Sequence, residues 1–177
     1  MRAAGPAQRS NSAPAGGSDA PKPQAQGGHP RVRVQSEDFD AGAAIARLRS
    51  ADHGAGAIAA FIGTVRDVND EATITGLTLE HYPGMTEAAL EEIVAEAKAR
   101  FDIRDALVVH RVGALLPGDQ IVLVVVSSAH RASAFDACAF IMDLLKTRAP
   151  FWKKERLPDA ERWVEGRASD DEAAARW

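Results

Sequence analysis

Two apolar runs meet at a turn in the stretch ALVVHRVGALLPGDQIVLVVVSSA, residues 106 to 129. The runs cover residues 106–113 and 120–129, and both are rich in valine, a residue that favours strands. Between them, LLPGD supplies the proline, glycine and aspartate that are typical of a tight turn. The stretch therefore predicts a β-hairpin.

A second hairpin is predicted upstream of the first. The small apolar run AIAAFIGTVRD, residues 57–67, ends in polar residues, and TITGLTLEHY, residues 73–82, alternates between apolar and polar positions. The short polar link at 68–72 joins the two as a hairpin. Residues 31–35, RVRVQ, also alternate as a half-buried strand does, and RWVEG at 162–166 predicts a further short strand.

Three segments have the apolar spacing of helices, and they cover residues 40–50, 86–101 and 131–148. In the last of them one side is predicted to be buried, and it carries Phe135, Cys138, Met142 and Leu145. Pro150 ends that helix. Near the C-terminus, Ser169 and Glu172 have the spacing of a capping box before DEAAARW.

Strand pairs separated by helices predict the α+β class, with an antiparallel or mixed sheet covered by helices. No G-x-G-x-x-G or G-x-x-x-x-G-K-[ST] motif follows any predicted strand, so neither a dinucleotide site nor a P-loop is supported. The composition predicts one globular domain over residues 31–177, because a chain of 177 residues with 46% hydrophobic content can bury a single core. Residues 1–30 are dominated by Ala, Gly, Pro, Gln and Ser and predict a disordered N-terminal tail.

Charge and cysteine content exclude several classes of protein. The formal net charge of -4 argues against a general nucleic-acid binder, which normally carries a strongly basic field. A single cysteine, Cys138, excludes an internal disulfide framework and fits a reducing cytoplasm. No apolar run approaches the ~20 residues that cross a bilayer, and no signal peptide is recognised. We therefore expect a cytoplasmic protein that binds neither nucleic acid nor membrane.

Cationic side chains follow the ends of two predicted strands. Arg66 closes FIGTVR, while His130 and Arg131 close IVLVVVSSAHR. If these strands lie side by side, we expect the three groups to converge near one sheet edge, with Lys146 of the following helix as a neighbour. Such a cluster suits a phosphate-bearing substrate, because arginine binds phosphate as a bidentate fork. The alternative for each residue is a surface arginine or a histidine that caps a helix.

The stretch LLKTRAPFWKKE, residues 144–155, combines cations with aromatic surface. One interpretation is a helix end whose Lys146 and Arg148 suit the negative end of the helix dipole, followed by a surface loop. The other is an anion-binding wall that contains Lys146 and Lys153. A lysine held among cations beside apolar surface can also act as a base or nucleophile.

Other reactive side chains have structural interpretations. His81 and His110 lie within or at the ends of predicted strands, so we expect packed or hydrogen-bonded histidines. Cys138 lies in phase with apolar residues of its helix, so we expect core packing rather than a sulfur carrier. No spacing resembling H-E-x-x-H supports a metal site, and no cofactor is expected.

The segments FIGTVR, LTLEHYPGMTEAAL, HRVGALLPGDQIVLVVVSSAHRASAF and DLLKTRAPFWKKE strongly resemble the large, catalytic subunit family of molybdopterin synthase. The resemblance spans about residues 32–177 and leaves out the tail, and we expect the loop 67–72 to vary in such proteins. It implies an α/β hammerhead-type fold. It also implies a sulfurtransferase that inserts two sulfur atoms as a dithiolene into cyclic pyranopterin monophosphate to give molybdopterin, in molybdenum cofactor biosynthesis.

The resemblance further implies a set of partners. Sulfur arrives as a thiocarboxylate on the C-terminal Gly-Gly of a small ubiquitin-like subunit, whose tail enters the pocket that holds Lys146. The assembly implied is a heterotetramer, in which a homodimer of this chain carries one small subunit at each end. No metal is required for the transfer, since the sulfur is already activated.

Site residues are carried over from the resemblance one by one. Lys146 and Lys153 match the two catalytic lysines of the family. The positions implied to bind substrate are Thr64, Val65, Arg66, His130, Arg131, Lys146, Lys153, Lys154, Glu155 and Arg167. Arg167 matches an arginine that reaches the pocket of the other protomer.

Two alternatives use the same cations. One is a noncatalytic module that binds a ubiquitin-like tail or a phosphorylated ligand, and the other is a Schiff-base lyase that uses Lys146. Reconstitution with the pterin precursor and thiocarboxylated small subunit separates the synthase from both.

Overall fold

The computed structural model describes residues 30–177 of the chain. The predicted tail at residues 1–30 lies outside the described residues, except for Pro30. The elements are β1 (Val32–Gln35), α1 (Ala41–Ala51), β2 (Ala57–Thr64), β3 (Val68–Asn69), β4 (Ala72–Thr73), β5 (Gly76–His81), α2 (Met85–Arg100), β6 (Asp105–Arg111), β7 (Gly113–Leu115), β8 (Gln120–Ser128), α3 (Arg131–Arg148), β9 (Phe151–Arg156), β10 (Glu161–Val164) and α4 (Ala168–Ala175). The mixture of helices and sheets confirms the predicted α+β class.

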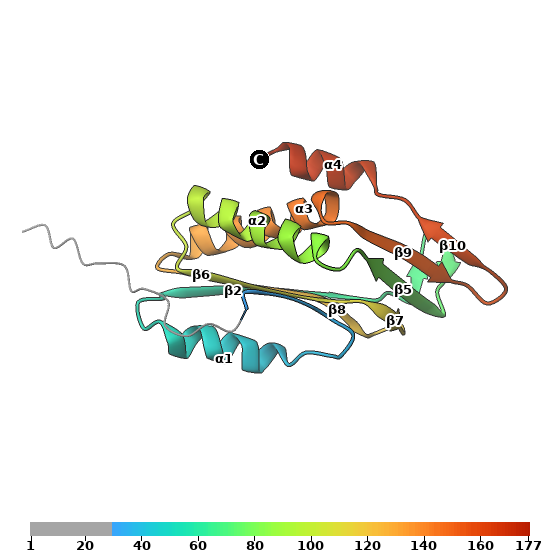
Figure 1. Ribbon diagram of the computed structural model, residues 1–177, viewed down its shortest axis with the longest axis horizontal. Helices are drawn as coiled ribbons and strands as arrows, with labels where there is room; N and C mark the ends of the chain where they lie inside the picture. The colour runs from blue at the N-terminus through green and yellow to red at the C-terminus, as the bar shows by residue number, and fades with distance from the viewer. Residues whose placement is uncertain (1–29) are drawn as a thin grey trace, which may run out of the picture.

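A four-stranded main sheet has the strand order β1-β6-β8-β2. The predicted hairpin of residues 106–129 is confirmed, because β6 and β8 pair antiparallel, with Val108 opposite Val124. β1 adds to β6 in parallel and β2 adds to β8 antiparallel. Helix α1 covers one face of this sheet, while α2 and α3 cover the other (Figure 1).

The apolar run of β8 is buried on both faces of the main sheet, which explains why it does not alternate with polar residues. Val122, Val124 and Val126 face a core shared with α2 and α3. Leu123 and Val125 face the smaller core formed with α1. β8 is therefore the central structural element of the described chain.

A second sheet has the strand order β10-β9-β5-β7 and lies beside one end of the main sheet (Figure 1). The predicted hairpin of residues 57–82 is wrong, because β2 pairs with β8, whereas β5 pairs with β7 and β9. The link between β2 and β5 forms its own two-stranded turn from β3 and β4. Pairing with the buried β8 places Ala59 and Ile58 of β2 against the two cores of the main sheet.

The helices agree with the predicted ranges, but two details differ. Phe135 is 66% exposed, so the predicted buried side of α3 was wrong there, while Cys138, Met142 and Leu145 are buried. The capping box of Ser169 is not formed. Arg167 is the N-cap of α4 and Ser169 lies inside the first turn, since the chain is already helical from Ala168. No helix of residues 30–177 is both long and apolar enough to cross a membrane.

Candidate functional site

A buried carboxylate lies at the centre of a cationic cluster in the second sheet. Glu155 is only 1% exposed and comes from β9, two residues after Lys153. Its Oε1 accepts a hydrogen bond from Asn69 Nδ2 at 2.7 Å and lies 3.3 Å from Lys153 Nζ. Its Oε2 accepts from Arg162 Nε at 3.0 Å. A buried carboxylate is stable only when it is paired in this way.

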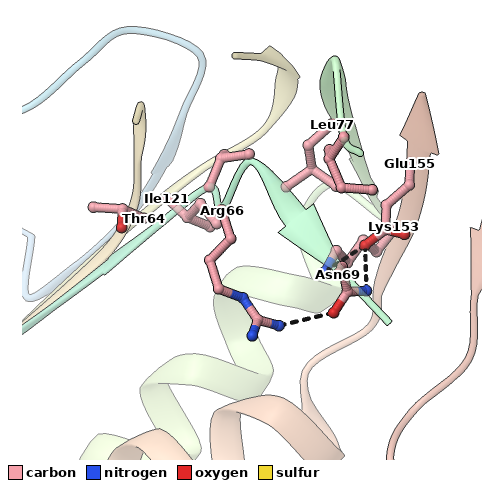
Figure 2. A pocket seen from close by; sticks show the side chains of 9 residues that line it. Thr64, Arg66, Asn69, Leu77, Ile121, Lys153 and Glu155 are labelled. Carbon is pink, nitrogen blue, oxygen red and sulfur yellow. Dashed lines mark hydrogen bonds and ion pairs between the residues drawn. The ribbon is translucent and has the colours of Figure 1, made fainter. Parts of the chain in front are cut away.

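The amide of Asn69 connects this carboxylate to two arginines. Its Oδ1 accepts from Arg66 Nη2 at 2.8 Å and from Arg167 Nη2 at 2.6 Å. Figure 2 shows the Arg66 side chain reaching Asn69, with Glu155 and Lys153 bonded beyond it. Arg167 also forms an ion pair with Asp70 at 3.1 Å. We call the group Arg66, Asn69, Lys153, Glu155, Arg162 and Arg167 the Glu155 cluster.

The charges of the Glu155 cluster set the protonation of its carboxylate. Burial raises the pKa of Glu155, but the hydrogen bond from Arg162 and the positive charge of Lys153 outweigh it, so the net pKa lies below its ordinary value. The carboxylate is therefore ionised at neutral pH. The cluster contains four cationic side chains, and Asp70 is the other acid bonded to them, so the cluster keeps an excess of positive charge that suits an anion.

A cavity of about 40 Å³ opens beside the cluster. It is lined by Thr64, Val65, Arg66, Asn69, Ile74, Leu77, Ile121, Lys153 and Glu155. Pockets that bury a whole small molecule usually measure several hundred Å³, ~300 or more. The cavity is large enough for an ionic group only, and the rest of a ligand would lie across the exposed surface around it.

Thr64 and Val65 hold the backbone at the rim of this cavity. The register between β2 and β8 shifts at Gly63 and Thr64, which ends regular pairing at this point. Val65 then donates its N–H to the carbonyl of Asp119 at 2.9 Å. This irregular end of β2 directs the next residue, Arg66, away from the sheet and toward Asn69.

Lys146 lies in the last turn of α3 and its side chain is half exposed. Its ammonium forms an ion pair with Asp170 of α4 at 2.8 Å. The backbone N–H of Asp170 bonds in turn to the carbonyl of Arg167. The first turn of α4 therefore connects Lys146 to the Glu155 cluster, although Lys146 lies on α3 and Lys153 of the cluster lies on β9.

His130 and Arg131 lie at the opposite end of the main sheet, so the predicted convergence with Arg66 is wrong within one chain. The two strands that carry them are neighbours, as expected. They run antiparallel, however, with Thr64 opposite Gln120 and Ala57 opposite Ser128. Both His130 and Arg131 are exposed, and the His130 side chain forms no cap hydrogen bond to α3.

The remaining predicted residues have definite partners. Lys154 pairs with Glu161 at 3.0 Å and its ammonium lies 5.5 Å from the centre of the Trp163 ring. Arg167 contacts Asn69 and Asp70 of its own chain rather than reaching outward. Lys154 therefore faces the β10 side of the second sheet, while Arg167 belongs to the cluster.

The histidines and the cysteine agree with their structural interpretations. His110 is buried, stacks on Phe151 with ring centres 3.8 Å apart, and has a pKa lowered to about 4 by burial. His81 also stacks against Phe151, with ring centres 6.4 Å apart, and its Nδ1 is buried without a hydrogen-bond partner among the described residues. Cys138 is 8% exposed and burial raises the pKa of its thiol to about 11.

Sequence reasoning missed Asn69, Arg162 and Asp170. Asn69 lies in the loop that we expected to vary, Arg162 in a short strand and Asp170 in a helix start. None of these carries a local signal of function, because each matters only through a partner distant in sequence. Within residues 30–177 no group of three or more His, Cys, Asp or Glu side chains is placed to hold a metal ion.

Comparison with known proteins gives consistent results. Residues 34–148 match the model of the family described as MoaE protein. The molybdopterin synthase catalytic subunit of Ralstonia nicotianae is 59% identical over 148 residues, 84% of each chain. Among solved structures, the molybdopterin cofactor biosynthesis protein E of Burkholderia multivorans has a TM-score of 0.70 and 57% identity, covering 82% of this chain and 94% of that one.

A more distant structure shares the same fold. The molybdopterin synthase of Staphylococcus aureus has a TM-score of 0.70 at 28% identity and covers 76% of this chain and 97% of that one. The family match spans most of the residues from β1 to the end of α3, which are the elements that position Arg66 and Lys146. The chain belongs to the MoaE family.

Proposed function

We propose that this chain is the catalytic subunit of a molybdopterin synthase and transfers sulfur from a thiocarboxylated small ubiquitin-like subunit to cyclic pyranopterin monophosphate. The observation that carries the proposal is the Glu155 cluster, which collects Arg66, Lys153 and Arg167 at one end of the molecule. The family supplies the reaction, and the cluster supplies a place for a phosphate-bearing ring system.

Arg66, Arg167 and Lys153 hold the anionic parts of the substrate in this proposal. The 40 Å³ cavity between Arg66 and Lys153 admits an ionic group, while the ring system lies on the surface outside. Guanidinium groups bind phosphate oxygens in pairs, and lysine adds a movable positive charge. Glu155 lines the same cavity and orients Lys153 through their ion pair.

Lys146 is assigned to the reacting carbon. It lies on the last turn of a packed helix, and the buried Leu145 beside it fixes its position. The incoming thiocarboxylate sulfur forms a bond to a pterin side-chain carbon as an oxygen substituent leaves. Water then cleaves the resulting thioester, so that sulfur stays on the pterin and a carboxylate returns to the small subunit. The same step at the neighbouring carbon, with a second thiocarboxylated small subunit, supplies the other sulfur of the dithiolene. A lysine ammonium at this point would stabilise the negative oxygen that develops at the acyl carbon.

The sulfur must come from outside this chain. Its single cysteine is buried in α3, and a thiol whose pKa is about 11 forms almost no thiolate at neutral pH. A thiocarboxylate supplied by the partner provides activated sulfur without any cysteine relay. This favours the synthase reaction over a reaction in which the chain carries its own persulfide.

His130 and Arg131 join the site from a second copy of the chain in this proposal. β2 is an edge strand of the main sheet and exposes Phe61 and Ile62. A two-fold pairing along β2 runs the two copies antiparallel, so the Thr64 end of one copy meets the Ala57 end of the other. That arrangement brings His130 and Arg131 of each copy toward Arg66 of its neighbour.

Reconstitution tests the proposed function. The full chain, the thiocarboxylated small subunit and the pyranopterin precursor are combined, and dithiolene-bearing pterin is measured by its fluorescent oxidation product. We expect molybdopterin to form in amounts that follow the thiocarboxylate consumed. Binding of the small subunit without any product would support the noncatalytic module instead. Trapping of Lys146 by borohydride with a carbonyl substrate would support the lyase.

Mixed oligomers test the shared site. Arg66→Ala and Arg131→Ala chains are each expected to lose most activity alone. When the two are co-expressed, a dimer with one chain of each kind keeps one complete site, so activity should return toward half of the wild-type value per mixed dimer. Failure of the mixture to recover any activity would place all these residues in one chain's site.

A further inference from the structure

Asn69 is buried in a turn whose neighbours are exposed. Its exposed fraction is 4%, whereas Val68, Asp70 and Glu71 are on the surface. Asp70 and Glu71 adopt left-handed backbone conformations, with φ of 50° and 63°. Such conformations are uncommon for residues with a side chain and are less favourable than ordinary backbone conformations. The turn therefore holds Asn69 inward at some cost in free energy.

The amide of Asn69 suits its surroundings because it both donates and accepts. Its Oδ1 accepts from two guanidinium groups, those of Arg66 and Arg167, and its Nδ2 donates to the carboxylate of Glu155. Its backbone carbonyl also accepts from Arg162 at 3.2 Å. The partners fix which end of the amide is oxygen, since arginines only donate and an ionised carboxylate only accepts.

No other side chain of this size satisfies both sides. An aspartate would keep the two arginines but would set a second negative charge against Glu155. An alanine would release Arg66, leave Arg167 to Asp70 alone, and leave Glu155 to Arg162 and Lys153. Both arginines are exposed, so without Asn69 the Arg66 side chain would sample many rotamers in water and Arg167 would keep only a surface ion pair.

We propose that Asn69 is a positioning residue for this site: its amide holds Arg66 and Arg167 side by side and, through Glu155, sets the place of Lys153. The inference rests on the proposed function of these three cations in holding the substrate. Asn69 lines the cavity, but its amide oxygen and nitrogen are already bonded to Arg66, Arg167 and Glu155, so it acts through these groups. It fixes in advance the geometry that the anion requires, which lowers the entropy lost when the substrate binds.

Substrate affinity and turnover are the measurements that test this role. Binding of the pyranopterin precursor is titrated calorimetrically into the complex with unactivated small subunit, so that no chemistry follows. Single-turnover rates are then measured with the thiocarboxylated subunit. For Asn69→Ala we expect the dissociation constant to rise about tenfold and the single-turnover rate at subsaturating precursor to fall by at least that factor. Val68→Ala, on the exposed side of the same two-residue strand, is the matched control and should stay within about twofold.

A double-mutant cycle separates positioning from a general structural effect. If Asn69 acts through Arg66 and Arg167, then Asn69→Ala in a background that carries both Arg66→Ala and Arg167→Ala should cost less than about threefold in affinity, because both partners are already gone. A full tenfold loss in that background would overturn the proposal. So would an Asn69→Ala chain that binds the precursor as tightly as the Val68→Ala control.

Asn69→Asp keeps the shape and serves if the alanine variant does not fold. It retains the acceptors for the two arginines but removes the donor to Glu155. We therefore expect precursor binding to weaken less than in Asn69→Ala. The single-turnover rate should still fall, because Lys153 is no longer held in place by Glu155. Wild-type behaviour of Asn69→Asp in both measurements would remove the link to Lys153. A wild-type complex that neither binds nor converts the precursor would refute the proposed function itself, whereas failure confined to the Asn69 variants would refute this inference alone.

Discussion

The central strands of the two sheets are built from opposite kinds of side chain. β8 is apolar over most of its length, and the residues from Val122 to Ser128 are buried. β9, FWKKER, carries four charged residues in six, and its one buried side chain is the carboxylate of Glu155. The main sheet thus contributes most of the apolar burial that stabilises the fold, while the second sheet carries charged side chains. We therefore expect substitutions in the two regions to separate stability from activity.

Lys146→Ala should give the largest effect and should act on activity alone. Lys146 is half exposed, so its removal leaves no cavity in the core. Loss of a group that stabilises a developing oxyanion typically lowers the rate by about 10² to 10³ or more. We expect single-turnover formation of molybdopterin to be nearly abolished, while binding of the small subunit and the thermal unfolding temperature change little. Near-normal turnover would remove Lys146 from the catalytic role.

Leu123→Ala should give the converse result in the main sheet. Leu123 lies on β8 and is fully buried in the core that this strand forms with α1. Truncation of such a leucine lowers the free energy of unfolding by roughly 2 to 5 kcal/mol. Denaturant unfolding measures the loss. The fraction that remains folded should retain wild-type turnover, because the Glu155 cluster contacts no side chain of the α1 core. A large fall in turnover per folded molecule would show that the two regions are not separable.

His110 links the two regions, because it lies on β6 and stacks onto Phe151 of β9. We expect its titration to make the free energy of unfolding depend on pH. Burial lowers its pKa to about 4, while the unfolded chain binds a proton near 6.5. The contribution of His110 to the free energy of unfolding is therefore fully present above pH ~6.5. It falls as the pH drops toward 4, and the total loss from this group is about 3 kcal/mol. The charge of the nearby His81 also disfavours the protonated form of His110, whereas the backbone carbonyl of Arg111 bonds to the His110 ring and favours it.

His110→Asn is the variant that tests this dependence. Denaturant unfolding at pH 7 and pH 4.5 gives the difference in unfolding free energy for each chain, and the variant should show the shallower dependence. The carboxylates, including Glu155 with its lowered pKa, titrate in both chains and so cancel in the comparison. Equal pH dependence in the two chains would mean that His110 is protonated as readily in the folded as in the unfolded state.

Cys138→Ala should have the smallest effect. Its thiol is packed among apolar residues of α3 and takes no hydrogen bond, so the loss is limited to a small cavity of about 1 kcal/mol. Turnover should remain close to that of the wild-type chain, as sulfur arrives from the partner. A folded Cys138→Ala chain that docks its small subunit but transfers no sulfur would overturn the proposed source of sulfur.

The local features of the fold were predictable where neighbours in sequence are neighbours in space. The β6–β8 hairpin followed from its turn residues, and the three main helices followed from apolar spacing that α2 and α3 bury against the sheet. The hairpin of β2 with β5 failed because β2 finds its partner in β8, some sixty residues later in the chain. The prediction that Phe135 is buried was wrong for a related reason. Only one side of α3 is buried, and Phe135 lies just beyond the edge of that side.

The composition of the site was therefore contained in the sequence, and its arrangement was not. The residues Arg66, Lys146 and Lys153 could be named as cations suited to an anionic substrate, because charge and donor geometry belong to each side chain. Which of them share a site depends on strand direction: antiparallel pairing of β2 with β8 separates Arg66 from His130. The contacts of Asn69 with Glu155 and Arg167 join residues that lie 86 and 98 positions apart, and only the folded chain brings them together.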